Sequence, residues 1–222
     1  MDDAPAHSLA QFEPEGIAAE GQGWQQRKSA QTRVTILEAA VDCLESVGYA
    51  RTTTQLIAQT AGISRGAMLH HYATKQDLIA AVIDYAFYKR MEAFLDRIAL
   101  LSDEQRIKDN AGVELYWQTL LTREFTAILE LKVASRTDDE LREIFLPKAR
   151  EYDKVERREV SRAFPEWADN SNYALAMDFV IASIEGLLLN RDIWNDRDRR
   201  VALRKLISRT LTPLREHRLD PG

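Results

Sequence analysis

Residues 53–77 restrict the fold of this chain more than any other stretch, because helix starts and stops follow one another there at short intervals. Thr53 or Thr54 can cap one short helix, and Ser64 can cap a second. Gly62 lies between the two, where a glycine allows the positive φ of a tight turn. Two short helices joined by such a turn are predicted to form a helix-turn-helix.

Longer helices are predicted on both sides of this motif. Before it, apolar residues from Val34 to Val47 recur at spacings of three and four, which predicts an amphipathic helix that stops at Gly48. After it, Thr74 and Asp77 resemble a capping box, with Asp in place of the usual Glu. The two helices are predicted over about 29–47 and about 75–101.

The rest of the chain has helical periodicity as well. Its 222 residues include only nine glycines and six prolines, too few turn formers for a many-stranded sandwich. The fold class is therefore predicted to be all-α. Further helices are predicted at about 110–121, 123–136, 138–162, 170–193 and 196–211.

This pattern divides the chain into four regions. Residues 1–26 lack helical or strand periodicity and are predicted to be a flexible tail. Residues 27–77 are predicted to form the helix-turn-helix domain, and residues 78–215 a larger helical domain. Residues 216–222 complete the chain as a short C-terminal tail.

Charge is unevenly distributed along the chain. A net charge of −5 would argue against a nucleic-acid partner if it were spread evenly. Residues 1–24, however, contain five acidic and no basic side chains, whereas Lys and Arg outnumber Asp and Glu over residues 25–80. The helix-turn-helix segment is therefore basic, which removes that objection without by itself demonstrating DNA binding.

The composition also indicates the cellular compartment in which the protein is expected. The single cysteine, Cys43, excludes an internal disulfide and a thiolate metal cluster, which favours a reducing compartment. The N-terminus begins with acidic residues and has no apolar core, so no secretory signal is predicted. The most apolar stretch, residues 173–189, is short and contains Asp178 and Glu185, which argues against a membrane span. We therefore expect a cytoplasmic protein with no membrane partner.

Residues 33–79 resemble the N-terminal DNA-binding domain of the TetR family of bacterial transcriptional regulators, in the order and length of every element. The resemblance rests on a combination of short motifs, each weak by itself. These motifs are Ala39-Ala40, Gly48-Tyr49, Thr53-Thr54, Ile57-Ala58, the run from Ala61 to Gly66, His71-Tyr72 and Thr74-Lys75.

The resemblance implies a function for each part of the chain. It implies a regulator that binds a palindromic operator in double-stranded DNA as a homodimer. It further implies that the larger helical domain dimerises and binds a small organic ligand, whose identity the sequence does not reveal. A repressor released from DNA by that ligand is the expected mode of action.

The second helix of a helix-turn-helix enters the major groove with its first residues facing the base edges. Arg65 is placed to pair with a guanine or a phosphate, while Met68 and Tyr72 are predicted to face inward. Leu69 departs from the family, which usually has tyrosine there, and could contact a thymine methyl instead. The expected DNA-binding residues are Thr53, Thr54, Ser64, Arg65, Gly66, Ala67, Leu69, His70, His71 and Lys75.

Aromatic and thioether side chains of the larger domain are candidates for a ligand pocket, although the same residues could simply fill the core. Lys132 lies at the edge of an apolar face, where it could meet an acidic ligand group or extend to solvent. The pocket candidates are Phe87, Met91, Phe94, Tyr116, Trp117, Phe125, Lys132 and Met177.

The last two long helices are the expected dimer surface, because two helices from each protomer can form a four-helix bundle about a two-fold axis. The apolar seam includes small residues that permit close packing. Its members are Tyr173, Ala174, Met177, Ile181, Ile184, Leu188 and Leu206.

Other function classes find less support in the residues. The chain lacks a recognisable nucleophile–base pair or phosphate-binding loop, and we expect neither an enzyme nor a cofactor. The adjacent His70 and His71 diverge on a helix and have no third ligand nearby, so no metal site is expected. A ligand-independent or activating DNA-binding regulator, and a regulator controlled by a partner protein, remain open alternatives.

Overall fold

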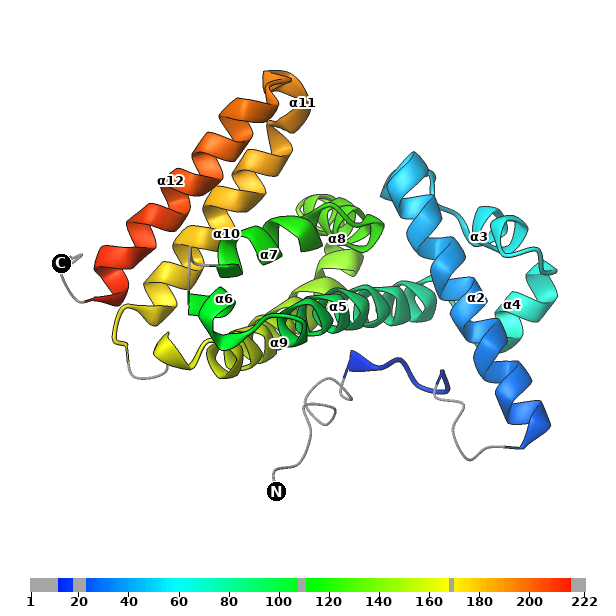
Figure 1. Cartoon of the computed structure of the whole chain (residues 1–222). Helices are drawn as coiled ribbons and strands as arrows, with labels where there is room; N and C mark the ends of the chain where they lie inside the picture. The colour runs from blue at the N-terminus through cyan, green and yellow to red at the C-terminus, as the bar shows by residue number, and fades with distance from the viewer. Residues whose placement is uncertain (1–11, 18–22, 108–110, 168–169, 217–222) are drawn as a thin grey trace. The chain divides into compact units, whose positions relative to one another are not determined.

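The computed structural model describes residues 12–17, 23–107, 111–167 and 170–216 (Figure 1). These residues form helices and connecting turns without any strand, which confirms the all-α prediction. The longer helices are α2 (Trp24–Val47), α5 (Lys75–Ala99), α8 (Arg123–Ala134), α9 (Asp139–Ala163), α10 (Tyr173–Leu189) and α12 (Arg197–Arg215). The shorter ones are α3 (Thr54–Thr60), α4 (Arg65–His71), α6 (Asp103–Ile107), α7 (Ala111–Leu120) and α11 (Arg191–Trp194), with 3-10 turns η2 (Tyr49–Arg51) and η4 (Pro165–Trp167).

The chain divides into two compact units. The first unit comprises Met1–Glu92 and Thr122–Val155, and the second comprises Ala93–Leu121 and Glu156–Gly222. Helices α5 and α9 each contribute residues to both units.

The first unit is built around α2, which packs on α3 and on α8 (Figure 1). Its inward face buries Leu37, Val41 and Leu44 at the helical spacing that the sequence showed. Arg123, at the start of α8, pairs with Glu38 and with Asp42, both on α2. Helix α8, which lies within the predicted larger domain, therefore packs against α2 of the predicted helix-turn-helix domain. The two segments are far apart in the chain, so local periodicity does not indicate this contact.

The second unit is a helical cluster in which α10 contacts α7 and α12, and α12 contacts α7. Ile184 and Leu187 of α10 are buried in it, as is Leu211 of α12. The Arg204 side chain joins α12 to α7, because its Nε lies 2.9 Å from a carboxylate oxygen of Glu114. None of the helices within the described residues is long and apolar enough to cross a membrane.

The N-terminal region differs from the predicted tail. Helix α2 begins at Trp24, and residues 12–17 are part of the first unit. Phe12 is only 3% exposed, since its ring packs edge-on against Phe87 and Tyr152, with centroids 6.5 and 5.7 Å away. An isolated aromatic residue has no periodicity, so no pattern of residues indicates this packing. Residues 1–11 and 18–22 of the predicted tail lie outside the described residues, as do residues 217–222 at the C-terminus.

The predicted helix over 170–193 is in fact two helices, because α10 ends at Leu189 and the short α11 follows. Asn195 ends α11 with a left-handed backbone, φ 39°. At the far end, α12 continues beyond its predicted end near residue 211 to Arg215, past Pro213.

Candidate nucleic-acid interface and cavity

The helix-turn-helix is set by local hydrogen bonds at the predicted positions. The Thr53 Oγ1 accepts from the Leu56 N–H at 3.1 Å and caps α3. The Ser64 Oγ accepts from the Ala67 N–H at 3.1 Å and caps α4. Gly62 adopts φ 67° in the turn between them, a conformation that favours glycine. These predictions about local structure are confirmed.

Helix α4 presents one face to the protein and the other to solvent. Met68 is fully buried and Tyr72 nearly so, which confirms the predicted inward pair. The side of α4 expected to face DNA is exposed at Ser64 through Ala67 and at Leu69 and His70, while His71 is half-buried. The geometry therefore leaves the start of α4 accessible to a groove.

Gly66 has no role in packing the protein. Among the described residues, a Cβ built at this position would meet only the Ser64 Oγ, at 3.9 Å. Its backbone also needs no positive φ. Because glycine weakens a helix interior, a glycine that the fold does not require is consistent with close approach of another molecule to the α4 backbone.

The capping box at the start of α5 is confirmed. The Thr74 N–H donates to Asp77 Oδ2 at 3.1 Å, and the Asp77 N–H donates to Thr74 Oγ1 at 3.0 Å. The Lys75 ammonium lies 4.5 Å from the centre of the Tyr49 ring, a cation–π contact that holds the cation beside the helix start. The Tyr49 hydroxyl donates to Asp138 Oδ2 at 3.1 Å; burial and this hydrogen bond raise the pKa of Tyr49 to about 12. Thr53, Thr54 and Lys75, the expected phosphate contacts, are exposed or half-buried.

Arg33 is a cation at this surface that the motif did not single out. Its guanidinium lies 5.7 Å from the centre of the Tyr72 ring. Burial, followed by the positive charges of Arg33 and His70, lowers the pKa of His71 below its ordinary value of 6.5. Arg33 belongs to α2, so only the tertiary structure brings its charge near Tyr72 and His71.

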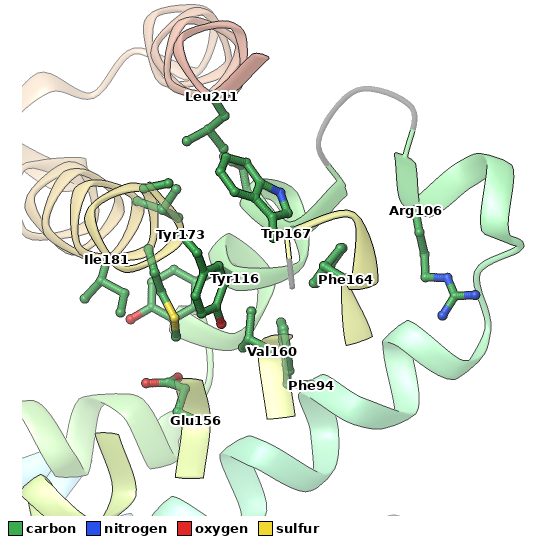
Figure 2. A pocket seen from close by; sticks show the side chains of 15 residues that line it. Phe94, Arg106, Tyr116, Glu156, Val160, Phe164, Trp167, Tyr173, Ile181 and Leu211 are labelled. Atoms are coloured by element: carbon green, nitrogen blue, oxygen red, sulfur yellow. The ribbon is translucent and has the colours of Figure 1, made fainter. Parts of the chain in front are cut away.

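The second unit contains a cavity of about 90 Å³, and three of the predicted pocket residues, Phe94, Tyr116 and Met177, line it (Figure 2). The complete lining comprises these three residues together with Arg106, Gly112, Val113, Glu156, Val160, Phe164, Trp167, Tyr173, Ala176, Val180, Ile181 and Leu211.

The other predicted pocket residues lie elsewhere. Phe87, Met91 and Phe125 are buried in the first unit, where Phe87 stacks on Tyr152 at 4.1 Å. Trp117 is buried beneath the guanidinium of Arg204, which lies 4.7 Å from its ring centre. Lys132 is exposed, as expected of a lysine that extends to solvent. Apolar residues look alike in sequence whether they fill a core or line a cavity.

The predicted dimer seam is also revised. Met177 and Ile184 are buried within the protomer, and Tyr173 and Ile181 line the cavity. Leu188 is half-buried, whereas Ala174 and Leu206 are exposed as expected. Helix α10 is apolar around most of its circumference, so its sequence does not indicate which side faces inward. The large apolar side chains that α10 leaves exposed are Leu175, Phe179 and Leu189.

Comparison with known proteins agrees with this geometry. Residues 36–82 match the family model described as bacterial regulatory proteins, tetR family. An uncharacterized HTH-type transcriptional regulator of Mycobacterium tuberculosis is 32% identical over 120 residues, which cover 54% of this chain and 60% of that protein. The regulator CymR of Pseudomonas putida is 31% identical over 123 residues, or 54% of this chain and 58% of that protein. The chain thus matches less than two thirds of the length of either relative.

A solved structure extends the similarity of the fold to most of the chain. A transcriptional regulator from Streptomyces coelicolor superposes with a TM-score of 0.61 at 23% identity, covering 82% of this chain and 99% of that one. These relatives are named as transcriptional regulators, in agreement with the prediction that the chain is not an enzyme. The similarity to the TetR family of bacterial regulatory proteins, which the sequence motifs predicted, is thus found over residues 36–82, the part of the chain that contains the helix-turn-helix.

Proposed function

We propose that this protein is a transcriptional repressor that binds a palindromic DNA operator as a homodimer and leaves it when a small organic ligand binds. The observation that carries the DNA-binding part is the exposed start of α4, with Arg65 beside a glycine that the fold does not require. Arg65 can pair with guanine O6 and N7, while Gly66 lets the helix backbone approach the base edges.

Electrostatics support the same surface. The capped starts of α3 and α4 and the start of α5 direct backbone N–H groups outward, where they can donate to phosphates. Lys75 and Arg33 add positive charge near these helix ends. Phosphate contacts of this kind would set the register of α4 in the groove, while Arg65 and Leu69 would read bases.

We expect a homodimer because the helix-turn-helix domain is small, and one such domain contacts too few bases for specific binding. The exposed side chains of α10 supply a surface for it. Leu175, Phe179 and Leu189 fall within about 80° of one another around a helix of 3.6 residues per turn. Ala182 and Gly186 lie on the same stripe, and small residues there permit close helix packing. Leu206 of α12 is 55% exposed and adds apolar surface.

The ligand would act through a two-state equilibrium. The cavity favours a regulator that is controlled by a ligand over a ligand-independent regulator, whose larger domain would have a solid core. Phe94 of α5 lines this cavity. Helix α5 runs without a break from its capped start, next to the helix-turn-helix, to this residue. A ligand that prefers a conformer in which α5 is shifted would move the two helix-turn-helix domains of the dimer apart and so weaken operator binding. By linkage, operator DNA would weaken ligand binding by the same factor by which the ligand weakens operator binding.

A salt-controlled binding assay tests the proposal. The purified protein would be titrated against DNA from beside its own gene, and against a selected random-sequence library, with random duplex as competitor. We expect tight binding that survives the competitor and selects a palindrome. Arg65→Ala should cost about 1–3 kcal/mol at one position of each half-site. Equal loss on operator and random DNA would refute base reading by Arg65, and the absence of any selected sequence would refute specific DNA binding.

A further inference from the structure

The ring of Tyr49 lies beside a cation that we expect to contact DNA. The Lys75 ammonium, at the start of α5, lies 4.5 Å from the centre of this ring. A lysine reaches its partners through a flexible stem, and ordering that stem on binding lowers the affinity. An aromatic face that already holds the ammonium reduces this cost. Tyr49 is thus placed to orient Lys75 before DNA binds.

Tyr49 itself is fixed by two carboxylates from distant parts of the chain. Its hydroxyl donates to Asp138 Oδ2 at 3.1 Å, and its backbone N–H donates to Glu130 Oε2 at 3.4 Å. Glu130 belongs to α8, and Asp138 directly precedes α9. Gly48 leaves room for Glu130, because a Cβ at this glycine would lie 2.9 Å from the same carboxylate oxygen. The backbone and the phenol of Tyr49 are therefore both held from outside the helix-turn-helix.

Asp138 is fixed as well. Its Oδ1 accepts from the Leu141 N–H at 2.9 Å, in the first turn of α9. This hydrogen bond lowers the pKa of Asp138; desolvation opposes the change, while the Tyr49 hydroxyl and the positive charge of Lys75 add to it. The charge of Lys75 thus reaches Asp138. Lys75, Tyr49 and Asp138 therefore interact as one group, and all three belong to the first unit.

The start of α5 holds the backbone of Lys75 in place. Thr74 and Asp77 form the capping box there. The Gln76 side chain donates to Glu140 Oε1 of α9 at 2.5 Å. An ammonium group carries three N–H donors, so contact with the face of a ring leaves donors for a phosphate oxygen. The Lys75 ammonium can therefore contact the ring and DNA at the same time.

We propose that Tyr49 is a positioning residue for DNA binding, because its ring holds the Lys75 ammonium ready for a phosphate of the DNA backbone. Asp138 and Glu130 in turn hold the ring. This inference rests on the DNA-binding part of the proposed function, since it concerns how one expected phosphate contact is made. A tyrosine that only packed the helix-turn-helix against α8 and α9 would instead affect DNA binding independently of Lys75.

A double-mutant cycle distinguishes the two roles. The full chain would be titrated by fluorescence anisotropy against a labelled duplex of random sequence, since a phosphate contact carries no sequence information. Tyr49→Leu should weaken binding about tenfold, because the Lys75 stem must then be ordered on binding. In a Lys75→Met background, the same substitution should change the affinity by less than about twofold. Tyr49→Phe keeps the aromatic face and should stay within about threefold of the wild type.

Lys75→Met alone tests the phosphate contact. It should make the dependence of log K on log salt concentration shallower by about 0.9 for each protomer that contacts the duplex. Tyr88→Leu is the matched control, since Tyr88 is also a half-buried tyrosine whose hydroxyl donates to a carboxylate, Glu92 Oε1 at 3.2 Å. Tyr88 lies about 20 Å further along α5 than Lys75, so its replacement should leave the affinity for the duplex unchanged.

A measurement on the wild type keeps the inference testable if Tyr49→Leu does not fold. In protein with isotopically labelled lysine, the ring current of Tyr49 should shift the ε-methylene resonance of Lys75 upfield. Lys75→Arg assigns that resonance by its absence. The upfield shift should persist when the duplex is added. A resonance that moves on DNA binding to the position of the exposed lysines would overturn the inference, because the ammonium would then have left the ring.

Two results with Tyr49→Leu would also overturn the inference: binding equal to that of the wild type, and an equal loss with and without Lys75. An unchanged salt dependence in Lys75→Met would remove the phosphate contact on which the inference rests. Selection of a palindromic operator is measured separately. A protein that selects an operator without coupling between Tyr49 and Lys75 would keep the proposed function and lose only this inference. A protein that shows the coupling on random duplex but selects no operator would lose only sequence-specific binding.

Discussion

Phe12 provides the sharpest test of how the N-terminal segment contributes to stability. The substitution Phe12→Ala removes a ring that is only 3% exposed and that touches Phe87 and Tyr152. Those two rings stack 4.1 Å apart at an interplanar angle of 14°, so Phe12 covers the edge of an existing aromatic pair. Pro14, two residues later, is buried as well.

Two estimates bound the loss of stability. Truncating a phenylalanine in a closed core costs about 3–5 kcal/mol, because the cavity left behind cannot collapse. Phe12, however, belongs to the short segment 12–17, which can leave the unit without unfolding the helices of that unit. The loss then cannot exceed the free energy of docking that segment, for which burial of one phenylalanine supplies about 1.5–3 kcal/mol. We therefore expect Phe12→Ala to reduce the free energy of unfolding of the first unit by about 1.5–3 kcal/mol.

Urea denaturation followed by far-UV circular dichroism measures this change, and limited proteolysis between residues 12 and 23 reports undocking directly. Glu15→Ala is the control, since Glu15 is an exposed residue of the same segment and its removal should cost less than about 0.5 kcal/mol. If Phe12→Ala unfolds at the same urea concentration as the wild type and is cleaved no faster, the packing of Phe12 does not stabilise the protein and the reasoning fails.

Three further predictions concern the DNA and dimer surfaces. Gly66→Leu should leave the unfolding temperature unchanged or slightly raised, because among the described residues only the Ser64 Oγ lies near a Cβ at this position. The same substitution should weaken operator binding at least tenfold. Operator affinity equal to that of the wild type would show that α4 does not approach DNA closely at Gly66. Folding lowers the pKa of His71, so the unfolded chain binds a proton on this imidazole more readily than the folded chain does. The contribution of His71 to the free energy of unfolding is therefore present above pH 6.5 and is lost as the pH falls through the pKa of the folded state. Urea denaturation at pH 7.5 and 5.5 should therefore show a smaller loss in His71→Gln than in the wild type, and an equal loss would contradict the assigned shift. If α10 forms the proposed homodimer interface, Phe179→Glu should convert the protein to a monomer in analytical ultracentrifugation, because like charges would then meet across the two-fold axis. It should also raise the operator dissociation constant by roughly 100-fold, whereas a dimer that Phe179→Glu leaves intact would place the interface away from α10.

The sequence by itself determined the helix-turn-helix. Thr53 and Ser64 cap helices through hydrogen bonds to residues three positions away, and Gly62 turns the chain through its own φ. The capping box of Thr74 and Asp77 works over the same short distance. Interactions that span three or four residues are written in the order of the residues, so pattern and spacing were sufficient to locate them.

Only the tertiary structure decided what the apolar residues of the longer helices do. Phe94 lines the cavity and Phe87, seven residues earlier on the same helix, does not, since the two lie in different compact units. Helix α10 is apolar on most sides, and its exposed stripe could be assigned only after α7 and α12 had covered the opposite side. Such roles depend on which segments meet, and contacts between residues far apart in the chain leave no period in the sequence.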